Sequence, residues 1–216
     1  MKNIPVFTTE YGTATLVLKE IPYRSLAYVI AQSVLPGGLE PLAAECLSFC
    51  RAAGAERVFL SAPGGGDCPW PEHTRILEMR SSREWIGQTE AFLFPVLPEL
   101  AGQYRELYNR AMACVDNAAT MERQDEAEFL QTGGGYFVHD GKKLLGLGQI
   151  VDGELRAVAA VERGRGADVV RALCGAGDFD TISLQVASTN ERALRLYTRL
   201  GFLPVGEVSR WHRLWG

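Results

Sequence analysis

The segment from residue 181 to residue 210 changes from one hydrophobic pattern to another. From Thr181 to Ala187 every second residue is apolar, which is the pattern of a half-buried strand. From Ala193 to Leu200 apolar residues recur at spacings of three and four, with three arginines on the opposite face, so an amphipathic helix is predicted. Asn190 is a suitable N-cap for this helix, and Gly201 ends it. The segment therefore predicts strand, helix and strand, in that order.

Three apolar runs ahead of this segment predict a meander of antiparallel strands. Asp140-Gly141 and Asp152-Gly153 separate the runs, and an aspartate followed by a glycine favours the tight turn of a β-hairpin. The runs are Gly135–His139, Lys143–Val151 and Glu154–Val161. We expect the three strands to be neighbours in one sheet.

Helical spacing dominates the segment before the meander. Apolar residues recur at threes and fours between Glu99 and Met121, and Arg123–Leu130 predicts a second, short helix. Glu90–Val96 supplies a strand ahead of both. The order is then strand, two helices, three strands, helix, strand, helix and strand, which is typical of a mixed α+β fold.

The first 91 residues carry a shorter pattern of the same kind. Two strands, one helix that ends at Gly54, and two further strands are predicted, and a loop rich in Gly and Pro between Ala62 and His73 separates the last two strands. The predicted elements are the strands Thr13–Ile21 and Leu26–Val34, the helix Leu39–Ala53, and the strands Glu56–Ala62 and Arg75–Arg80.

Composition narrows the class of protein. A chain of 216 residues with 47% apolar residues can bury a sizeable core, and a net charge of −4 without a basic cluster argues against a nucleic-acid-binding surface. The five cysteines are scattered, without the paired spacing of a zinc site or of a disulfide framework, which fits a reducing cytoplasm. No apolar run has the length of a signal-peptide core or of a membrane span, so neither export nor membrane insertion is expected.

The order of elements from residue 92 to residue 216 resembles that of the GNAT N-acetyltransferase superfamily. Its last motif matches Asn190, Ala193, Leu196, Tyr197, Leu200, Gly201 and Phe202. The resemblance implies an α+β fold with a GNAT-like mixed, mostly antiparallel sheet flanked by helices. Residues 92–216 would form a complete GNAT domain. Residues 1–91 resemble a truncated copy, a smaller α/β half-domain in front.

A glycine-rich loop joins the last strand of the meander to an apolar helix. Glycines allow backbone N–H groups to turn inward, and a helix N-terminus adds positive potential, which together suit a pyrophosphate. The loop resembles the GNAT phosphate loop, so the residues expected to bind acetyl-CoA are Arg163, Gly164, Arg165, Gly166, Ala167 and Asp168. Asp168 departs from the small residue usual in the family and places negative charge near the expected phosphates. The alternative is a solvated turn whose aspartate favours the helix N-terminus.

The same resemblance implies the catalytic residues. Tyr197 corresponds to the general acid that protonates the CoA thiolate, with a core tyrosine as the alternative, and Glu154 corresponds to a general base, with a solvated strand-end carboxylate as the alternative. Backbone groups of Val158 and Ala159 would hold the acetyl and pantetheine parts. Asn190 would contact CoA, cap its helix, or do both.

These expectations combine into direct transfer of acetyl from acetyl-CoA, as co-substrate, to an amine of a small molecule or a protein. The three histidines lack the mutual spacing of a metal or nucleophilic site, so no metal is expected. We expect no nucleic-acid or membrane partner. The sequence leaves open whether the chain forms a homodimer. One alternative is an inactive GNAT-fold binding or regulatory module, and another is a nucleic-acid surface at Arg163 and Arg165, against which the acidic balance argues.

Overall fold

The computed structural model describes residues 4–63 and 68–216. The chain folds as two compact units. Unit 1 comprises the residues up to Arg75 together with Val208–Gly216, and unit 2 comprises Ile76–Glu207. Each unit has its own hydrophobic core.

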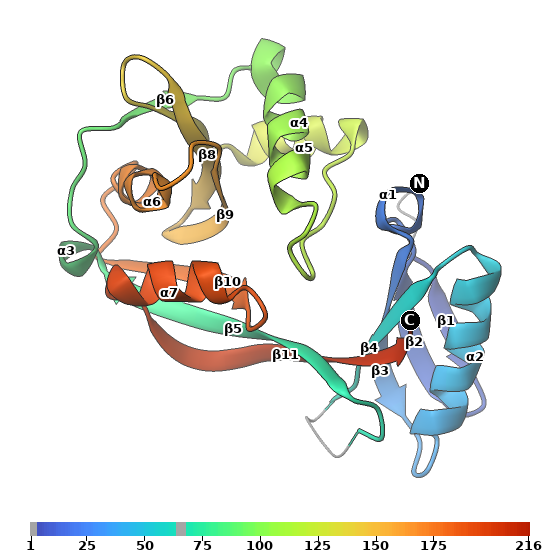
Figure 1. Cartoon of the computed structure of the whole chain (residues 1–216). Helices are drawn as coiled ribbons and strands as arrows, with labels where there is room; N and C mark the ends of the chain where they lie inside the picture. Colours follow the sequence, from blue (N-terminus) through green and yellow to red (C-terminus); the bar gives the residue numbers. More distant parts are fainter. Residues whose placement is uncertain (1–3, 64–67) are drawn as a thin grey trace. The chain divides into compact units, whose positions relative to one another are not determined.

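Unit 1 is a sheet with one long helix on its face (Figure 1). The sheet order is β1-β2-β3-β4, followed by the end of β11, and among the described residues of this unit only β3 and β4 run parallel. Helix α2 buries Leu42, Ala43, Cys46 and Cys50 in the core, because these residues recur at helical spacing on one side. The elements are β1 (Val6–Thr9), β2 (Gly12–Val17), α1 (Ile21–Arg24), β3 (Leu26–Val34), α2 (Leu39–Ala52) and β4 (Arg57–Ser61).

Two strands extend from one unit into the other. In β5 (Glu72–Ser82), residues Ile76–Ser82 pair antiparallel with β10 of unit 2. In β11 (Leu203–Trp215), residues from His212 onward pair antiparallel with β4 of unit 1. The compact units therefore divide differently from the expected boundary between residues 91 and 92. The reason is that β10 pairs on its second edge with β5, which precedes residue 92. Strand β4 in turn pairs with the end of β11, the last strand of the chain.

Unit 2 is a mixed, mostly antiparallel sheet flanked by helices, as the α+β prediction requires (Figure 1). The sheet order is β5-β10-β9-β8-β7-β6, and β9 with β10 is the one parallel pair that the structure describes in this unit. The strands are β6 (Phe92–Pro95), β7 (Gly135–His139), β8 (Leu144–Val151), β9 (Glu154–Ala160) and β10 (Thr181–Ala187). The helices are α3 (Arg83–Ile86), η2 (Pro98–Leu100), α4 (Ala101–Met112), η3 (Arg123–Asp125), α5 (Glu126–Thr132), α6 (Gly166–Cys174) and α7 (Glu191–Arg199).

The predicted meander is confirmed. Strands β7, β8 and β9 are consecutive antiparallel neighbours. Asp152 and Gly153 both have positive φ, 50° and 80°, as the type I′ turn of a two-residue hairpin requires. The hairpin signal in the sequence was therefore sufficient to place β8 beside β9.

The predicted long helix from Glu99 to Met121 is wrong in its second half. Helix α4 ends at Met112, and the chain then turns back along it. The Asn109 side chain holds this return, since its Nδ2 donates to the carbonyl of Met121 and its Oδ1 accepts from the Met121 N–H, both at 2.8 Å. Hydrophobic periodicity does not reveal a side chain that hydrogen-bonds to a segment beyond the end of its helix. The short elements β1, α1 and α3 were not predicted either.

Helix α6 packs closely on β8 because β8 presents glycines beneath it. A Cβ on Gly148 would lie 2.4 Å from Cδ1 of Leu173, and a Cβ on Gly146 would lie 2.6 Å from Cγ2 of Val169. Side chains at these positions would push the helix away from the sheet. The two glycines thus set how closely α6 packs on β8.

Candidate functional site

The parallel strands β9 and β10 separate soon after they begin. Their register pairs only Glu154 with Ser183 and Leu155 with Leu184. Beyond Leu155, the edge of β9 that faces away from β8 has no strand partner among the residues that the structure describes. An unpaired strand edge offers N–H and C=O groups at regular spacing to a ligand.

Backbone groups of neighbouring residues on β9 point to opposite edges. The carbonyl oxygens of Ala157 and Ala159 lie toward β8, at 2.4 Å and 2.3 Å from where a Cβ on Gly148 and on Gly146 would lie. Because successive residues of a strand alternate, the N–H and C=O of Val158 point to the open edge. The backbone of Val158 is therefore available to a ligand, whereas that of Ala159 faces the β8 ladder.

A tight turn connects β9 to α6. The Arg165 N–H donates to the carbonyl of Glu162 at 3.2 Å, and Gly164 has φ +85°, which suits the third position of a type II turn. A Cβ on Gly164 would meet no atom within 4 Å, so this glycine serves the backbone conformation and leaves open space beside the turn. The turn delivers the chain directly into α6 at Gly166.

The first turn of α6 has no side-chain cap within the described residues. The residue at the cap position, Arg165, makes no capping bond, and the first helical bond runs from the Val169 N–H to the Arg165 carbonyl at 3.1 Å. The N–H groups of Gly166, Ala167 and Asp168 therefore lie ahead of the helical ladder, at the positive end of the helix dipole. This is the arrangement that binds phosphate groups at helix N-termini.

The two arginines of the turn have different surroundings. Arg163 is exposed, and no partner is recorded for its guanidinium among residues 4–63 and 68–216. Arg165 is half-buried, and its Nε donates to Oδ2 of Asp168 at 2.6 Å. Arg163 is the arginine that can reach a new anion without breaking an ion pair.

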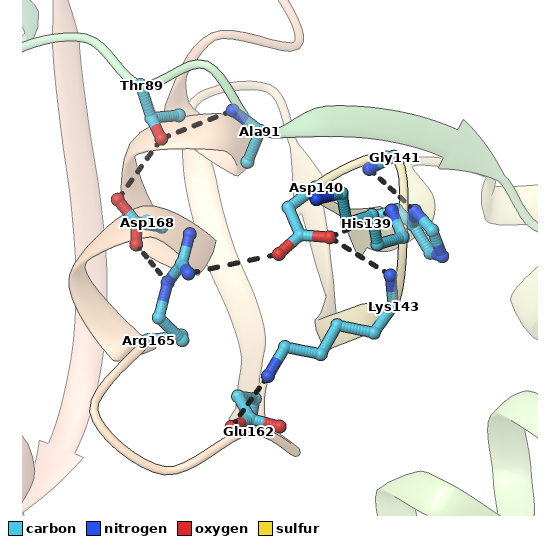
Figure 2. A network of polar contacts seen from close by, with 10 residues as sticks. Thr89, Ala91, His139, Asp140, Gly141, Lys143, Glu162, Arg165 and Asp168 are labelled. Carbon is cyan, nitrogen blue, oxygen red and sulfur yellow. Dashed lines mark hydrogen bonds and ion pairs between the residues drawn. The ribbon is translucent and has the colours of Figure 1, made fainter.

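Asp168 lies in a network of polar contacts (Figure 2). Its Oδ1 accepts from the Thr89 hydroxyl at 3.2 Å, while its Oδ2 accepts from Arg165. The guanidinium of Arg165 also faces Oδ2 of Asp140 at 3.9 Å. Both oxygens of the Asp168 carboxylate thus have partners within the protein, and Arg165 neutralises its charge. The negative charge of Asp168 argued against phosphate binding at this loop, and its pairing with Arg165 weakens that argument.

Asp140 anchors the far side of the network. Hydrogen bonds from the backbone N–H groups of Lys143 and Lys142, both at 3.0 Å, lower the pKa of the Asp140 carboxyl, and the nearby Arg165 adds to the effect. The ammonium of Lys143 pairs with Glu162 at 3.0 Å. The β7–β8 turn and the β9–α6 turn are therefore held together by ion pairs (Figure 2).

Helix α7 begins at the end of β10. The Asn190 side chain accepts from the Ala193 N–H at 3.2 Å, so the predicted helix cap is confirmed. A Cβ on Gly166 would lie 3.0 Å from Cδ2 of Leu196 and 4.0 Å from Cβ of Ala160. The start of α6, the end of β9 and the middle of α7 therefore meet at Gly166.

Tyr197 lies in the core beneath α7. Its side chain is 8% exposed, and its ring lies 5.8 Å from that of Phe202, centroid to centroid. Burial, with a smaller contribution from Cys174, raises the pKa of Tyr197 to about 12. The phenol is thus protonated at neutral pH, as a proton donor must be. Its ring also packs in the core, as expected under the alternative that Tyr197 is a core tyrosine.

Glu154 stands at the start of β9, where β9 and β10 are still paired. Its Oε2 accepts from Nε of Arg156 at 3.1 Å, and both side chains are partly exposed. Among the described residues no contact between Glu154 and Tyr197 is recorded. The residues that meet Gly166 are thus Ala160 on β9 and Leu196 on α7, whereas Glu154 lies at the other end of β9.

Two residues that the sequence left without a role lie near this region. The hydroxyl of Thr189, next to the cap Asn190, donates to Oδ2 of Asp116 at 2.6 Å, which ties the segment after α4 to the start of α7. Tyr104 on α4 is 1% exposed, and its hydroxyl has no hydrogen-bond partner in the described structure. In the sequence, Tyr104 was simply one apolar position of a helix.

No three His, Cys, Asp or Glu side chains are grouped so as to hold a metal ion within the described part of the chain. None of the helices described is both long and apolar enough to cross a membrane.

Comparison with known proteins gives the fold. No protein-family model and no curated protein matches the sequence. A GCN5-related N-acetyltransferase from Kribbella flavida superposes with a TM-score of 0.59 over 97% of this chain and 88% of that one, at 16% identity. Another, from Sphaerobacter thermophilus, has a TM-score of 0.52 over 93% of this chain and 75% of that one, at 15% identity. A Staphylococcus epidermidis protein of unknown function reaches 0.61 over 99% and 94%, at 9% identity.

The chain therefore has the fold of the GCN5-related N-acetyltransferases, and the predicted resemblance to GNAT proteins is confirmed at the level of fold. At identities this low the likeness carries the architecture alone, since one fold can host several functions.

Proposed function

We propose that the chain is an acetyl-CoA-dependent N-acetyltransferase that moves the acetyl group directly to an amine. The observation that carries the proposal is the open edge of β9, which leads into a type II turn and an uncapped helix N-terminus. A long ligand with a phosphate part and an amide-bearing arm fits such a site, because the strand edge can pair with amides and the helix start with phosphate.

The residues present fit the phosphate part of CoA. Backbone N–H groups of Gly166, Ala167 and Asp168 would hold the pyrophosphate, and the exposed Arg163 would add a mobile cation. Asp168 does not oppose this, since Arg165 and Thr89 hold both of its carboxylate oxygens. The backbone of Val158 would pair with the acyl and pantetheine arm along the open edge. Asn190 would both cap α7 and face the same ligand.

Acetyl-CoA would supply an activated acyl group in a thioester. For transfer, the amine nitrogen must form a bond to the acyl carbon, the carbon–sulfur bond must break, and the sulfur must gain a proton. Tyr197 would donate that proton from its hydroxyl and regain one from solvent. Glu154 would accept the proton that the amine loses, through water, because its partly exposed carboxylate can exchange protons with solvent.

The pKa of Tyr197 defines what this acid can do. With a pKa of about 12, the Tyr197 hydroxyl stays protonated throughout the physiological pH range, so it is always able to donate a proton. The same shift makes it a weaker acid than a free phenol, so transfer to sulfur must coincide with cleavage of the carbon–sulfur bond, when the sulfur is most basic. We expect no loss of activity from Tyr197 ionisation below about pH 11.

The acceptor in this proposal is an amine of a small molecule or of a protein. The reaction would take place in the cytoplasm, where the five free cysteines of the described residues stay reduced. An inactive GNAT-fold binding or regulatory module is the competing function, and the binding experiment below separates the two.

The proposal is tested first by calorimetry with acetyl-CoA on the wild-type chain, on Arg163→Gln and on Arg195→Gln. Arg195 is a matched control because it is an exposed arginine paired with Glu191 on α7. We expect micromolar binding by wild type, about tenfold weaker binding by Arg163→Gln and little change in Arg195→Gln. No binding by wild type would overturn the proposal and favour the binding module.

Binding is followed by turnover with a panel of small primary amines and lysine-containing peptides. Formation of free CoA is measured by chromatography, because the exposed Cys114 would itself react with thiol reagents. Amine-dependent CoA release would identify the acceptor class. Binding without release for every amine and peptide would favour the binding module.

A further inference from the structure

Asp168 is the third residue of helix α6, which follows the cap residue Arg165. An acidic side chain at this position commonly folds back and accepts a hydrogen bond from the backbone N–H of the cap residue. The helix dipole also stabilises negative charge there. By position alone, the Asp168 carboxylate would therefore compete with the proposed phosphate ligand for the N–H groups of the first turn.

The chain makes this kind of helix start elsewhere. In the short helix η3, Asp125 is also the third residue, and its Oδ2 accepts from the N–H of the cap residue Glu122 at 2.9 Å. At α6 the corresponding bond is not made. The Arg165 N–H donates to the carbonyl of Glu162 at 3.2 Å instead, and no side chain caps the helix in the described structure. The two aspartates thus share a position and differ in what their carboxylates contact.

Thr89 accounts for this difference. Its hydroxyl donates to Oδ1 of Asp168 at 3.2 Å and accepts from the Ala91 N–H at 3.3 Å, so its single hydrogen is directed to the carboxylate (Figure 2). Oδ2 of Asp168 accepts from Nε of Arg165. Because Arg165 and Asp168 belong to the same turn, their side chains can move together, whereas Thr89 comes from a separate segment between α3 and β6. Thr89 therefore fixes the carboxylate to a point outside the helix.

The segment that carries Thr89 is itself attached to α6. Nε of Arg171 donates to the carbonyl of Ile86 at 3.0 Å, and Arg171 lies three residues beyond Asp168, on the same face of the helix. Two side chains one helical turn apart on α6 thus contact two points of the segment, Thr89 and Ile86. This double attachment holds the Thr89 hydroxyl beside the first turn of α6.

We propose that Thr89 is a positioning residue that holds the Asp168 carboxylate away from the N-terminus of α6. The backbone N–H groups of Gly166, Ala167 and Asp168 then stay available to the phosphate part of CoA. This role rests on the proposed function, and it explains how a loop with an aspartate at this position can still bind an anion. Without the Thr89 hydroxyl, Oδ1 would turn toward these N–H groups, because the helix dipole attracts it, and would compete with the ligand.

Calorimetry with CoA tests the proposal on Thr89→Val, on Asp168→Ala and on the double variant. The Kd of Thr89→Val should be about fivefold weaker than that of wild type, the effect expected of one hydrogen bond. Asp168→Ala removes the competing carboxylate, so Thr89→Val should have no effect on the Kd in that background. Thr132→Val is the control and should bind like wild type, since it removes a hydroxyl that donates to the carbonyl of Glu128 on α5.

Backbone amides of the unliganded protein provide a second readout, which does not depend on CoA. Hydrogen exchange is followed by NMR at Gly166, Ala167 and Asp168. In Thr89→Val at least one of these amides should exchange more slowly than in wild type, because it gains the carboxylate as an acceptor. The double variant with Asp168→Ala should not show this slowing. A merely structural hydroxyl would have the opposite effect, since its loss would loosen the helix start and speed exchange.

Other results overturn the proposal. An unchanged Kd in Thr89→Val would mean that the hydroxyl does not protect the site, and a loss that persists in the double variant would mean that Thr89 acts without Asp168. Unchanged or faster exchange in the first turn of α6 would show that the carboxylate does not move there. In each of these cases the proposed function stands as long as wild type binds CoA. If wild type binds no CoA, the proposed function fails, and the positioning role of Thr89 fails with it.

Discussion

In each unit, the described residues include one pair of parallel strands joined by a helix. The two pairs differ in how many positions stay paired. In unit 1, β3 and β4 flank α2 and remain paired over five successive positions, from Leu26 with Arg57 to Ile30 with Ser61. In unit 2, β9 and β10 flank α6 and are paired at only two positions. The first pair is closed by its own hydrogen bonds, and the second leaves an edge for a ligand.

The turns that precede the two helices have the same backbone form. In unit 1 the Gly38 N–H donates to the carbonyl of Leu35 at 2.8 Å, with Gly37 at φ +72°. In unit 2 the Arg165 N–H donates to Glu162, with Gly164 at φ +85°. The unit 1 turn has Pro36 where unit 2 has Arg163, so it offers no cation.

Under the proposed function, the strand–turn–helix form alone would not be sufficient for a binding site. Both units have it, but only unit 2 combines it with an exposed arginine and an unpaired strand edge. The proposed function therefore rests on where the sheet opens and on which side chain occupies the turn.

Replacing Tyr197 with phenylalanine should lower turnover by about 100-fold or more, since a general acid contributes roughly that much. The Kd for acetyl-CoA should stay within a factor of about two, because the open edge and the turn are unchanged. The measurement is amine-dependent CoA release together with calorimetry. Tyr136→Phe, a partly buried tyrosine on β7, is the control. Unchanged turnover in Tyr197→Phe would assign Tyr197 to the core only.

Gly148→Val should destabilise unit 2 by about 3 kcal/mol, the upper part of the range for overpacking. The new Cβ would lie 2.4 Å from both the carbonyl oxygen of Ala157 and Cδ1 of Leu173. Gly206→Val is the control, since a Cβ there meets nothing within 4 Å. Urea unfolding gives the free energies. Equal stability of the two variants would show that α6 does not depend on close approach to β8.

Alkaline pH should destabilise both units, by about 2 kcal/mol for each buried thiol at pH 11. Burial is the main cause that raises the pKa of Cys46 in unit 1 and of Cys174 in unit 2, each to about 12. Because these folded-state values lie above the unfolded value of 9.0, the stabilisation is complete below pH 9 and is lost as pH rises toward 12.

The measurement is the slope of the unfolding free energy between pH 8 and 11. Cys46→Ser and Cys174→Ser should each flatten it, although serine lowers the absolute stability at both sites. Cys114→Ser, at an exposed position, is the control. A slope that neither buried substitution changes would mean that these thiols do not set the alkaline limit.

Gly164→Ala and Gly37→Ala test the two turns directly and should have the smallest effects on stability. Each places a Cβ on a residue with positive φ and open space around it, so each should cost about 1 kcal/mol of stability. Only Gly164→Ala should also weaken acetyl-CoA binding, by a few-fold, because it shifts the backbone N–H groups of the turn. Equal effects of the two variants on binding would contradict a site at the unit 2 turn.

The local elements of the site could be predicted from residues that are close together in the chain. The hairpin at Asp152-Gly153, the cap at Asn190 and the glycine turn before α6 all depend on residues close together in the chain, so their patterns were sufficient to predict them. The GNAT-like order of elements followed from the same patterns, and the observed fold agrees with it. The roles of Tyr197, Glu154 and the loop residues stay predictions.

Where the sheet opens and which charges are already paired depend on contacts between distant segments. The separation of β9 from β10, the pairing of β10 with β5, and the contacts of Asp168 with Arg165 and Thr89 join segments whose partners no local pattern specifies. The unpaired hydroxyl of Tyr104 belongs to the same class, since helical spacing marks a buried position but not what its polar atom meets. Hydrogen bonds and packing between distant segments are properties of the assembled core, and the function proposed here depends on them.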